Sequence, residues 1–333
     1  MEKRIKVVQY GLGPIGCKVT QYLTERHHFE IVGAIDSDPK KVGTDLGHLA
    51  ELNEPLGVKV TANSRDLLEP VDADVVILTT TSDLKKIRSQ IMEIISCGKN
   101  VVSTCEELMY PWVTNPDLAR EIDGAAKEHK VSVLSTGVNP GFLMDFLPLV
   151  MTSICREVKK VTVERIQDAQ FRRLPFQEKI GAGLSVEEFE NRVREGSLRH
   201  VGLTESMHLV ASRLGWILDR TEDVVDPVLA ERQVVTKNRT IEPGKALGVN
   251  QIGRAYVDSK EVITLVFRAS IGEPDPRDRI VIEGNPDIDM AISKGINGDT
   301  ATCAIIVNSI PIVIQAQPGL RTMADISPIS FFR

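Results

Sequence analysis

The alternation of apolar runs and amphipathic segments over the first 150 of the 333 residues restricts the fold more than any other feature. The apolar runs are typical of strands buried on both faces: IKVVQYG, FEIVGAID, ADVVILTTT, NVVSTCEE and VSVLSTG. Between them, PIGCKVTQYLTERHH and DLKKIRSQIMEIISCG carry apolar residues at helical spacing. Strands that alternate with helices predict an α/β fold with a doubly wound parallel sheet.

The pattern changes after about residue 145, which predicts a second, α+β domain. VKKVTVERIQDA alternates as a strand, and two helical stretches are expected over about 176–195 and 203–218. GRAYVDSKEVITLVFRASI is typical of an antiparallel hairpin that turns at Asp258-Ser259. We therefore expect domains over 1–145 and 146–300, with a C-terminal helix over about 300–333 that packs back on the first.

Composition and charge exclude several classes of protein. Lys and Arg number 40 against 46 Asp and Glu, a net charge of -6 without a basic block, so no nucleic-acid or membrane partner is expected. Small molecules are the expected ligands. The five cysteines are scattered and none forms a CxxC pair, which favours a reducing, cytoplasmic location. No export signal, no apolar run of roughly 20 residues and no metal-ligand spacing is found, so neither a membrane span nor a metal site is expected.

A glycine-rich turn follows the first predicted strand. In VVQYGLGPIG, Gly11 allows a sharp turn, Gly13 admits a pyrophosphate to a helix N-terminus, and Gly16 lets helix and strand pack closely. The alternative is a plain tight turn between strand and helix. Asp36 ends the second strand about 20 residues later, as in dinucleotide-binding domains. We expect the cofactor to be bound by this loop and by the end of the second strand: Gly11, Leu12, Gly13, Pro14, Ile15, Gly16, Asp36 and Ser37.

Asp36 also bears on which nicotinamide cofactor binds. A carboxylate at this position repels a 2′-phosphate, so NAD is the expected cofactor and NADP remains possible. Lys40 and Lys41 either soften this preference or are solvated charges at a helix start. At the end of another strand, the Thr79–Thr81 stretch either lines the nicotinamide ribose or forms a turn in which Ser82 or Asp83 caps the next helix.

Two adjacent acids, Glu106 and Glu107, follow the strand NVVSTC. Two capping boxes compete for them, Thr104-x-x-Glu107 and Ser103-x-x-Glu106. If Thr104 is the cap, Glu107 is structural and Glu106 is left for chemistry, with Thr104 close to the cofactor. In the remaining alternative, both acids only stabilise a helix by their interaction with the positive end of its dipole.

Further candidates lie in a loop and in the second domain. Asn139-Pro140-Gly141-Phe142 breaks regular structure at the same sheet edge and is predicted to form a substrate pocket, an interdomain hinge or both. The second domain offers Arg165, Asp168 and His200 as candidate substrate contacts, although a lone His at a helix entry is more often a packing residue.

Seven short motifs together resemble the dihydrodipicolinate-reductase-like dehydrogenases, and within them the 2,4-diaminopentanoate and native amine dehydrogenases. They are GLGPIG, AIDSDPKKVGTDLG, VVSTCEELMYPW, STGVNPGFLMD, KIGAGLSVEEF, HVGLTES and QAQPGLRTMADI, spread nearly end to end. The HHxxKxDxPSGTA signature of dihydrodipicolinate reductase is missing, and His27-His28 lack its context.

This resemblance implies a Rossmann-type domain, a second domain with an open mixed sheet, a homodimer, and reversible oxidative deamination of a primary amine with NAD or NADP. The family's catalytic glutamate corresponds to Glu106. Asn139, Pro140 and Phe142 would enclose the substrate, and Asp168 or His200 would contact its distal group. The rival interpretations are an oxo-acid or aldehyde reductase resembling homoserine dehydrogenase, which usually employs a Lys, and a non-catalytic NAD-responsive regulator.

Overall fold

The computed structural model describes residues 4–170, 172, 174–237 and 239–332. The chain divides into two compact units. Unit 1 comprises Met1–Phe142 and Asn297–Arg333, and unit 2 comprises Leu143–Ile296. The sequence places these divisions at 145/146 and about 300, and residues 1–3 and 333 of the predicted ranges lie outside the described residues.

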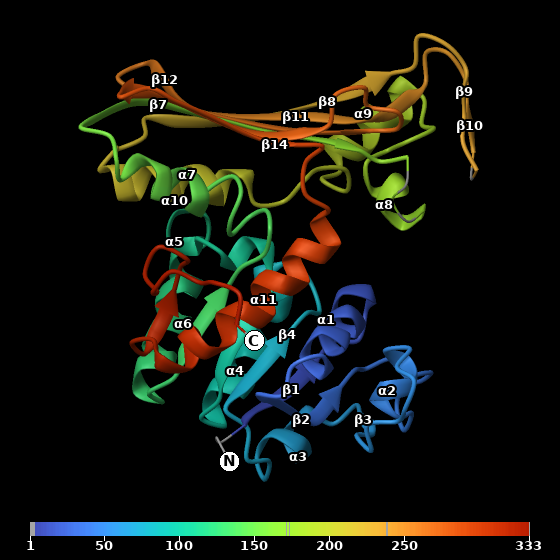
Figure 1. The fold of residues 1–333 in the computed structure, drawn as a ribbon, viewed down its shortest axis with the longest axis vertical. Helices are drawn as coiled ribbons and strands as arrows, with labels where there is room; N and C mark the ends of the chain where they lie inside the picture. The colour runs from blue at the N-terminus through green and yellow to red at the C-terminus, as the bar shows by residue number, and fades with distance from the viewer. Residues whose placement is uncertain (1–3, 171, 173, 238, 333) are drawn as a thin grey trace. The chain divides into compact units, whose positions relative to one another are not determined.

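Unit 1 is a parallel seven-stranded sheet flanked by helices, which confirms the predicted doubly wound α/β class (Figure 1). The strand order is β15-β6-β5-β4-β1-β2-β3. Strands β2 and β3 are added on one side of β1 and strands β4, β5 and β6 on the other, so the strand order reverses between β1 and β4 although all strands are parallel. The strands are β1 (Ile5–Tyr10), β2 (Phe29–Ile35), β3 (Val60–Thr61), β4 (Val75–Leu78), β5 (Asn100–Ser103), β6 (Ser132–Ser135) and β15 (Gly319–Arg321). The helices are α1 (Pro14–Thr24), α2 (Leu46–Leu49), α3 (Ser64–Leu68), α4 (Leu84–Ser96), the 3₁₀ turn η1 (Glu106–Leu108), α5 (Pro111–Thr114), α6 (Pro116–Glu128) and α11 (Gly298–Gln315).

Helix α4 shows how the sequence pattern becomes packing. Ile87, Ile91 and Ile94 recur at helical spacing and are each fully buried against the sheet. Burying a side chain of this size contributes roughly 1.5–3 kcal/mol. The helix ends where Gly98 takes a φ of 67°, a conformation that glycine adopts at little cost.

The C-terminal segment differs from the prediction of one helix over about 300–333. Helix α11 ends at Gln315, and β15 then adds a seventh strand beside β6. Pro318 and Gly319, with a φ of 127° at Gly319, break the helical pattern between the two. The sequence of this segment carries no clear strand signal, because three residues are too few for an alternating pattern.

Helix α11 is long and apolar enough to cross a membrane by length and composition, with a mean hydropathy of 1.2 over its 18 residues. It nevertheless packs as a core helix does, in contact with α1 and with the central strands of the sheet. Val307, Ile310 and Val313 are fully buried in this packing. A buried helix of a folded domain passes the same test, so the finding does not indicate a membrane span.

Unit 2 carries a six-stranded mixed sheet in the order β14-β13-β7-β12-β11-β8, as predicted for the second domain (Figure 1). β12 and β7 are parallel, and the other pairs are antiparallel. The strands are β7 (Glu157–Asp168), β8 (Arg220–Leu229), β11 (Ala246–Val257), β12 (Lys260–Ser270), β13 (Arg277–Asn285) and β14 (Ile288–Ser293), with a separate pair β9 (Val234–Val235) and β10 (Thr240–Ile241). The helices are α7 (Phe146–Thr152), α8 (Leu174–Lys179), α9 (Val186–Arg194) and α10 (Leu203–Leu214).

The predicted hairpin is confirmed, and one predicted helix is wrong. β11 and β12 turn at Asp258 and Ser259, whose φ angles of 48° and 61° are those of a type I′ turn. The single helix expected over about 176–195 is instead α8 and α9, because Gly181 and Gly183 take positive φ angles of 76° and 90° between them. A capping box at Ser185 then starts α9.

Candidate active site

The glycine loop lies at the point where the strand order of unit 1 reverses. Gly11 takes a φ of 93°, and its N–H donates to the carbonyl of Ile35 at 2.8 Å. Thr79, at the end of β4, holds the loop from the other side: its N–H donates to Tyr10 O and its hydroxyl donates to Gly11 O, both at 2.8 Å. In open α/β sheets, ligands bind at this reversal.

The three glycines of the loop have different surroundings. A Cβ at Gly16 would lie 1.9 Å from Gly11 O, so close packing of α1 on the strand requires glycine there. A Cβ at Gly13 would meet no atom within 4 Å, which leaves space above the start of α1. Gly13 is also the N-cap of α1, and no side chain caps this helix start. An open helix N-terminus of this kind fits the pyrophosphate of a dinucleotide.

Gln9 supports the same loop and was not predicted. Its fully buried amide donates to Gly11 O at 3.0 Å and to Thr79 Oγ1 at 2.9 Å. A glutamine within the apolar run VVQYG is the only local signal, and that run does not show which atoms the amide reaches.

Asp36 lies directly after β2 and its carboxylate is largely buried. It accepts hydrogen bonds from Leu12 N at 2.7 Å, from Asp38 N at 2.9 Å and from Lys41 Nζ at 2.9 Å. Burial raises the pKa of this carboxyl, but the bonds from Asp38, Lys41 and Leu12 outweigh it and hold the pKa below its usual range. The acid predicted to bind ribose is therefore ionised and anchored to the glycine loop.

The two lysines after Asp36 differ from each other. Lys40 is exposed, as expected of a solvated charge, and so is Ser37, which the sequence predicts to contact the cofactor. Lys41 is not a solvated charge, because its ammonium forms an ion pair with Asp36. That Lys41 softens the preference for NAD remains a prediction.

The hydroxyls after β4 mostly have local partners. Thr80 donates to Gln90 at 2.7 Å, and Asp83 N donates to Thr81 Oγ1 at 3.3 Å. Asp83 caps α4 by accepting from Lys86 N at 3.1 Å. The turn-and-cap alternative is therefore observed, and contact of Thr79, Thr80 or Thr81 with a ribose remains a prediction.

Neither predicted capping box forms around Glu106 and Glu107. η1 has Cys105 at its N-cap and no side-chain cap bond, while Thr104 N donates to Leu78 O at 3.1 Å. Glu107 instead accepts from Leu84 N at 2.8 Å, at the start of α4. Glu107 is thus structural, as the alternative with Thr104 as the cap expected, but its partner lies in a different helix, 23 residues away along the chain.

The backbone around Glu106 is held by neighbouring strands. Cys105 N donates to Ser103 Oγ at 3.0 Å, and the hydroxyl of Ser135 donates to Cys105 O at 2.6 Å. On the next residue, Glu107 N donates to Ser82 O at 3.3 Å. Burial raises the pKa of the Cys105 thiol to about 12, so this cysteine is protonated and no nucleophile at neutral pH.

The Glu106 side chain contrasts with this fixed backbone. Its Oε2 atom is buried and makes no hydrogen bond with any described residue. A buried carboxylate oxygen without a donor is unfavourable by roughly 1–3 kcal/mol or more. Such an atom, held on a rigid turn at the carboxyl edge of the sheet, is suited to accept a proton or a hydrogen bond from a ligand.

The predicted substrate loop follows β6 in the same unit. Thr136 N donates to Ser103 O at 2.9 Å, which places the start of this loop beside the end of β5. Gly141 takes a φ of 122°, and a Cβ there would lie 2.5 Å from Gly137 N, so the loop folds back on itself. Asn139 and Phe142 are half-buried and Pro140 is buried in this turn.

The candidates in unit 2 have structural partners. Arg165 is buried and paired with Asp278 at 2.9 Å. Asp168 Oδ1 accepts from Gln170 N and Gly272 N, both at 2.9 Å, and so joins two loops. His200 packs edge-on against Phe267, with ring centroids 4.2 Å apart. These contacts give each of the three residues a structural role. Their contact with a substrate remains a prediction.

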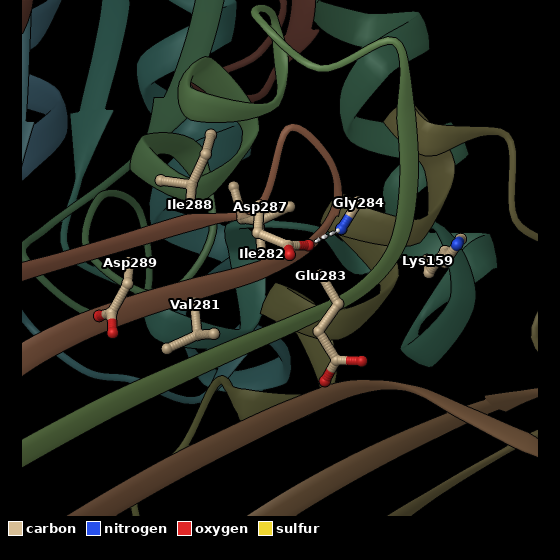
Figure 2. A pocket seen from close by; sticks show the side chains of 8 residues that line it. All are labelled: Lys159, Val281, Ile282, Glu283, Gly284, Asp287, Ile288 and Asp289. Atoms are coloured by element: carbon tan, nitrogen blue, oxygen red, sulfur yellow. Dashed lines mark hydrogen bonds between the residues drawn. The ribbon is translucent and has the colours of Figure 1, made fainter.

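Unit 2 also has a surface hollow of about 530 Å³ (Figure 2). None of the predicted site residues lines it, and two of its three acids have partners: Asp287 accepts from Gly284 N at 2.8 Å, and Asp289 pairs with Arg279. We assign it no role. Among the residues that the structure describes, no three His, Cys, Asp or Glu side chains gather as metal ligands would.

Comparison with known proteins identifies the class and then the family. Residues 5–105 match the dihydrodipicolinate reductase N-terminal domain, and residues 142–331 match the 2,4-diaminopentanoate dehydrogenase C-terminal domain. With the parallel sheet and its glycine loop, these matches define an NAD(P)-dependent oxidoreductase with a Rossmann-type domain. The chain belongs to the 2,4-diaminopentanoate dehydrogenase family, which confirms the resemblance seen in the sequence motifs.

Individual relatives agree with this assignment. The 2,4-diaminopentanoate dehydrogenase of Acetoanaerobium sticklandii is 35% identical, over 98% of this chain and 94% of that protein. An amine dehydrogenase of Streptomyces virginiae is 23% identical, over 97% of this chain and 96% of that protein. The structure of an amine dehydrogenase from Mycobacterium smegmatis superimposes with a TM-score of 0.87 at 25% identity, covering 100% of this chain and 98% of that one. These relatives make the chain an enzyme of the dehydrogenase class.

Proposed function

We propose that this enzyme catalyses the NAD(P)-dependent oxidative deamination of a primary amine, with 2,4-diaminopentanoate as substrate and 2-amino-4-oxopentanoate and ammonia as products. The observation that carries the proposal is the buried Oε2 of Glu106, which makes no hydrogen bond within the part of the chain that the structure describes. The names of the A. sticklandii and S. virginiae relatives support the substrate class. The reaction is reversible in principle, as reductive amination of a ketone or aldehyde.

The net reaction converts an ammonium substrate, water and the oxidised cofactor into a ketone, an ammonium ion, the reduced cofactor and a proton. A bound nicotinamide would supply the acceptor for the hydride from the carbon that bears nitrogen. Glu106 would take the proton from the substrate ammonium and pass it to solvent, so that its carboxylate is charged again and stabilises the iminium cation that loss of hydride leaves. It would next activate the water that attacks the iminium carbon. Positioned proton transfer of this kind contributes roughly 10²–10⁴-fold in rate.

The surroundings of Glu106 suit this role. Its backbone is fixed by the bonds that Ser135 Oγ donates to Cys105 O and Glu107 N donates to Ser82 O, so the turn that carries the carboxylate does not need to be ordered on binding. Glu107, one residue away, is already bonded to Leu84 N. The structural difference between the two acids supports Glu106 as the catalytic base and Glu107 as its support.

NAD is the proposed cofactor, with NADP as a possible second one. The open start of α1 at Gly13 would hold the pyrophosphate, and Asp36 would accept from the adenosine ribose. Ser37, Thr79–Thr81 and Thr104 remain proposed cofactor contacts. Asn139, Pro140 and Phe142, and from unit 2 Asp168 and His200, remain proposed substrate contacts.

The proposal includes a homodimer. Gly253 on β11 faces Met207 and Leu203 of α10, so its neighbour Ile252 points to the opposite face of the unit 2 sheet. There Ile252 pairs with Val266 of β12, and both are half-buried. This face offers apolar area for a second copy, and light scattering would measure the mass. Cytoplasmic location also remains a prediction.

Turnover tests the function directly. The purified enzyme is mixed with NAD or NADP and with 2,4-diaminopentanoate, simple alkylamines, homoserine and amino acids, and absorbance of the reduced cofactor is followed. Oxidation of the diamine with release of ammonium supports the proposal. Homoserine oxidation without amine turnover favours the reductase alternative instead. Cofactor binding without turnover of any compound favours a regulator.

A further inference from the structure

The carboxylate of Asp36 has little capacity left for a ribose. Its Oδ2 accepts from Leu12 N at 2.7 Å and from Lys41 Nζ at 2.9 Å, and its Oδ1 accepts from Asp38 N at 2.9 Å. An ionised carboxylate offers about four acceptor positions. One position therefore remains for a ribose hydroxyl while Lys41 is in place, and the ammonium of Lys41 is the one side-chain donor among the three.

Lys41 is positioned to leave Asp36 without disturbing the backbone. Its N–H donates to Asp38 O at 2.9 Å, which fixes the turn, and its ammonium also lies 3.9 Å from Asp38 Oδ2. The Lys41 side chain is 26% exposed, whereas that of Asp36 is 11% exposed. The two main-chain donors to Asp36 would remain if the ammonium moved, so the carboxylate would not become an unpartnered buried charge.

We propose that Lys41 determines the choice between NAD and NADP by moving between two partners. With NAD bound, Lys41 stays on Asp36, and the ribose uses the remaining acceptor position. With NADP bound, Lys41 pairs with the 2′-phosphate and offsets its repulsion by Asp36. The inference rests on the proposed function only in that a nicotinamide dinucleotide binds at the glycine loop.

Charge explains why one lysine would matter here. A phosphate monoester carries a charge of about -1.5 to -2 at neutral pH, and Asp36 and Asp38 add two carboxylates beside it. Attraction between opposite unit charges about 4 Å apart is several times stronger in a partly buried site than in bulk water. Without Lys41, the 2′-phosphate would meet two acids and no fixed cation on this turn, whereas a ribose hydroxyl carries no charge to repel.

Direct binding tests the inference without any amine. The fluorescence of NADH and of NADPH is titrated with wild-type protein and with Lys41→Gln, Lys41→Arg and Lys40→Gln. We expect Lys41→Gln to raise the Kd for NADPH at least tenfold and to change the Kd for NADH less than threefold. Lys41→Arg keeps NADPH binding, because arginine also binds phosphate. Lys40→Gln, at the exposed neighbouring position, leaves both values unchanged.

Each of the other possible binding results leads to a different conclusion. Equal weakening of both cofactors by Lys41→Gln, with an unchanged melting temperature, would mean that Lys41 only orients Asp36 and would overturn the inference. If Lys41→Gln changes the Kd of neither cofactor, the inference is also overturned. The same holds if wild-type protein binds NADH and does not bind NADPH. Wild-type protein that binds neither cofactor contradicts the proposed function itself. Salt provides a second readout: wild-type affinity for NADPH should fall more steeply with ionic strength than that for NADH, and Lys41→Gln should remove the difference.

Discussion

Glu106 and Glu107 are adjacent in sequence and differ in surroundings, so substituting each by glutamine separates chemistry from stability. Glutamine has nearly the size of glutamate, carries no charge, and has an NH₂ group in place of one carboxylate oxygen. Glu106 Oε2 is buried without a hydrogen bond, whereas Glu107 Oε2 accepts from Leu84 N at 2.8 Å. We expect Glu106→Gln to lose most turnover and keep the stability of the fold, and Glu107→Gln to keep turnover and lose some stability.

The magnitudes follow from these contacts. Loss of a positioned general base lowers kcat by roughly 10²–10⁴-fold, which corresponds to about 3–5 kcal/mol of transition-state stabilisation. Glu106 Oε2 makes no hydrogen bond with any described residue, so Glu106→Gln breaks no contact of that atom, and its free energy of unfolding should lie within about 0.5 kcal/mol of the wild-type value. Glu107→Gln keeps an acceptor for Leu84 N but loses its charge at a helix start, at a cost of about 0.3–1 kcal/mol.

Two assays on the same samples make the comparison. Cofactor reduction with 2,4-diaminopentanoate measures kcat and KM, and circular dichroism measures the melting temperature. A change of 1 kcal/mol shifts the melting temperature by about 2–4 °C for a domain of 150–250 residues. Glu107→Gln should therefore melt about 1–4 °C lower and keep kcat within threefold, while Glu106→Gln should show the opposite combination.

Two results would contradict these roles of Glu106 and Glu107. If Glu106→Gln keeps kcat within threefold of wild type, this carboxylate is not the base, whatever its burial. If both variants lose activity and stability together, the turn as a whole is structural. Binding of NADH to each variant is the control, since both should retain it when the glycine loop is intact.

The glycine loop and its acid allow further tests. Gly16→Ala should fail to fold or melt far below wild type, because its Cβ would lie 1.9 Å from Gly11 O. A Cβ at Gly13 would meet no described atom within 4 Å, so Gly13→Ala should melt normally but bind NADH about 10–100-fold more weakly by titration. Normal NADH binding by Gly13→Ala would contradict the pyrophosphate assignment. The pKa of Asp36 is lower in the folded protein, so its carboxylate stabilises the fold fully above its unfolded pKa of about 3.9 and progressively less as the pH falls through the folded pKa. The difference in melting temperature between wild type and Asp36→Asn should therefore shrink as the pH falls from about 5 to 3, and a constant difference would show that this pKa is not lowered.

The sequence by itself determined those features that depend on residues close together along the chain. The apolar runs and amphipathic segments predict the doubly wound sheet, because burial on both faces of a strand and on one face of a helix leaves a period in the residues themselves. The turn at Asp258 and Ser259 is equally local, since a two-residue hairpin loop needs residues that tolerate positive φ. The glycine loop belongs with these, because Gly11 takes a φ of 93° and a Cβ at Gly16 would lie 1.9 Å from Gly11 O, five residues before it.

Where a contact joins distant segments, only the tertiary structure decided it. Glu107 fits a capping box with Thr104 three residues before it, yet it bonds to Leu84 N in another helix. Lys41 has the pattern of a solvated charge and instead pairs with Asp36. The unpartnered oxygen of Glu106 is likewise invisible in a pattern of letters, because burial without a donor depends on how β5, β6 and α4 come together. Sequence patterns record the preferences of neighbours along the chain, and the partner of a polar atom is set by packing between elements that are far apart in it.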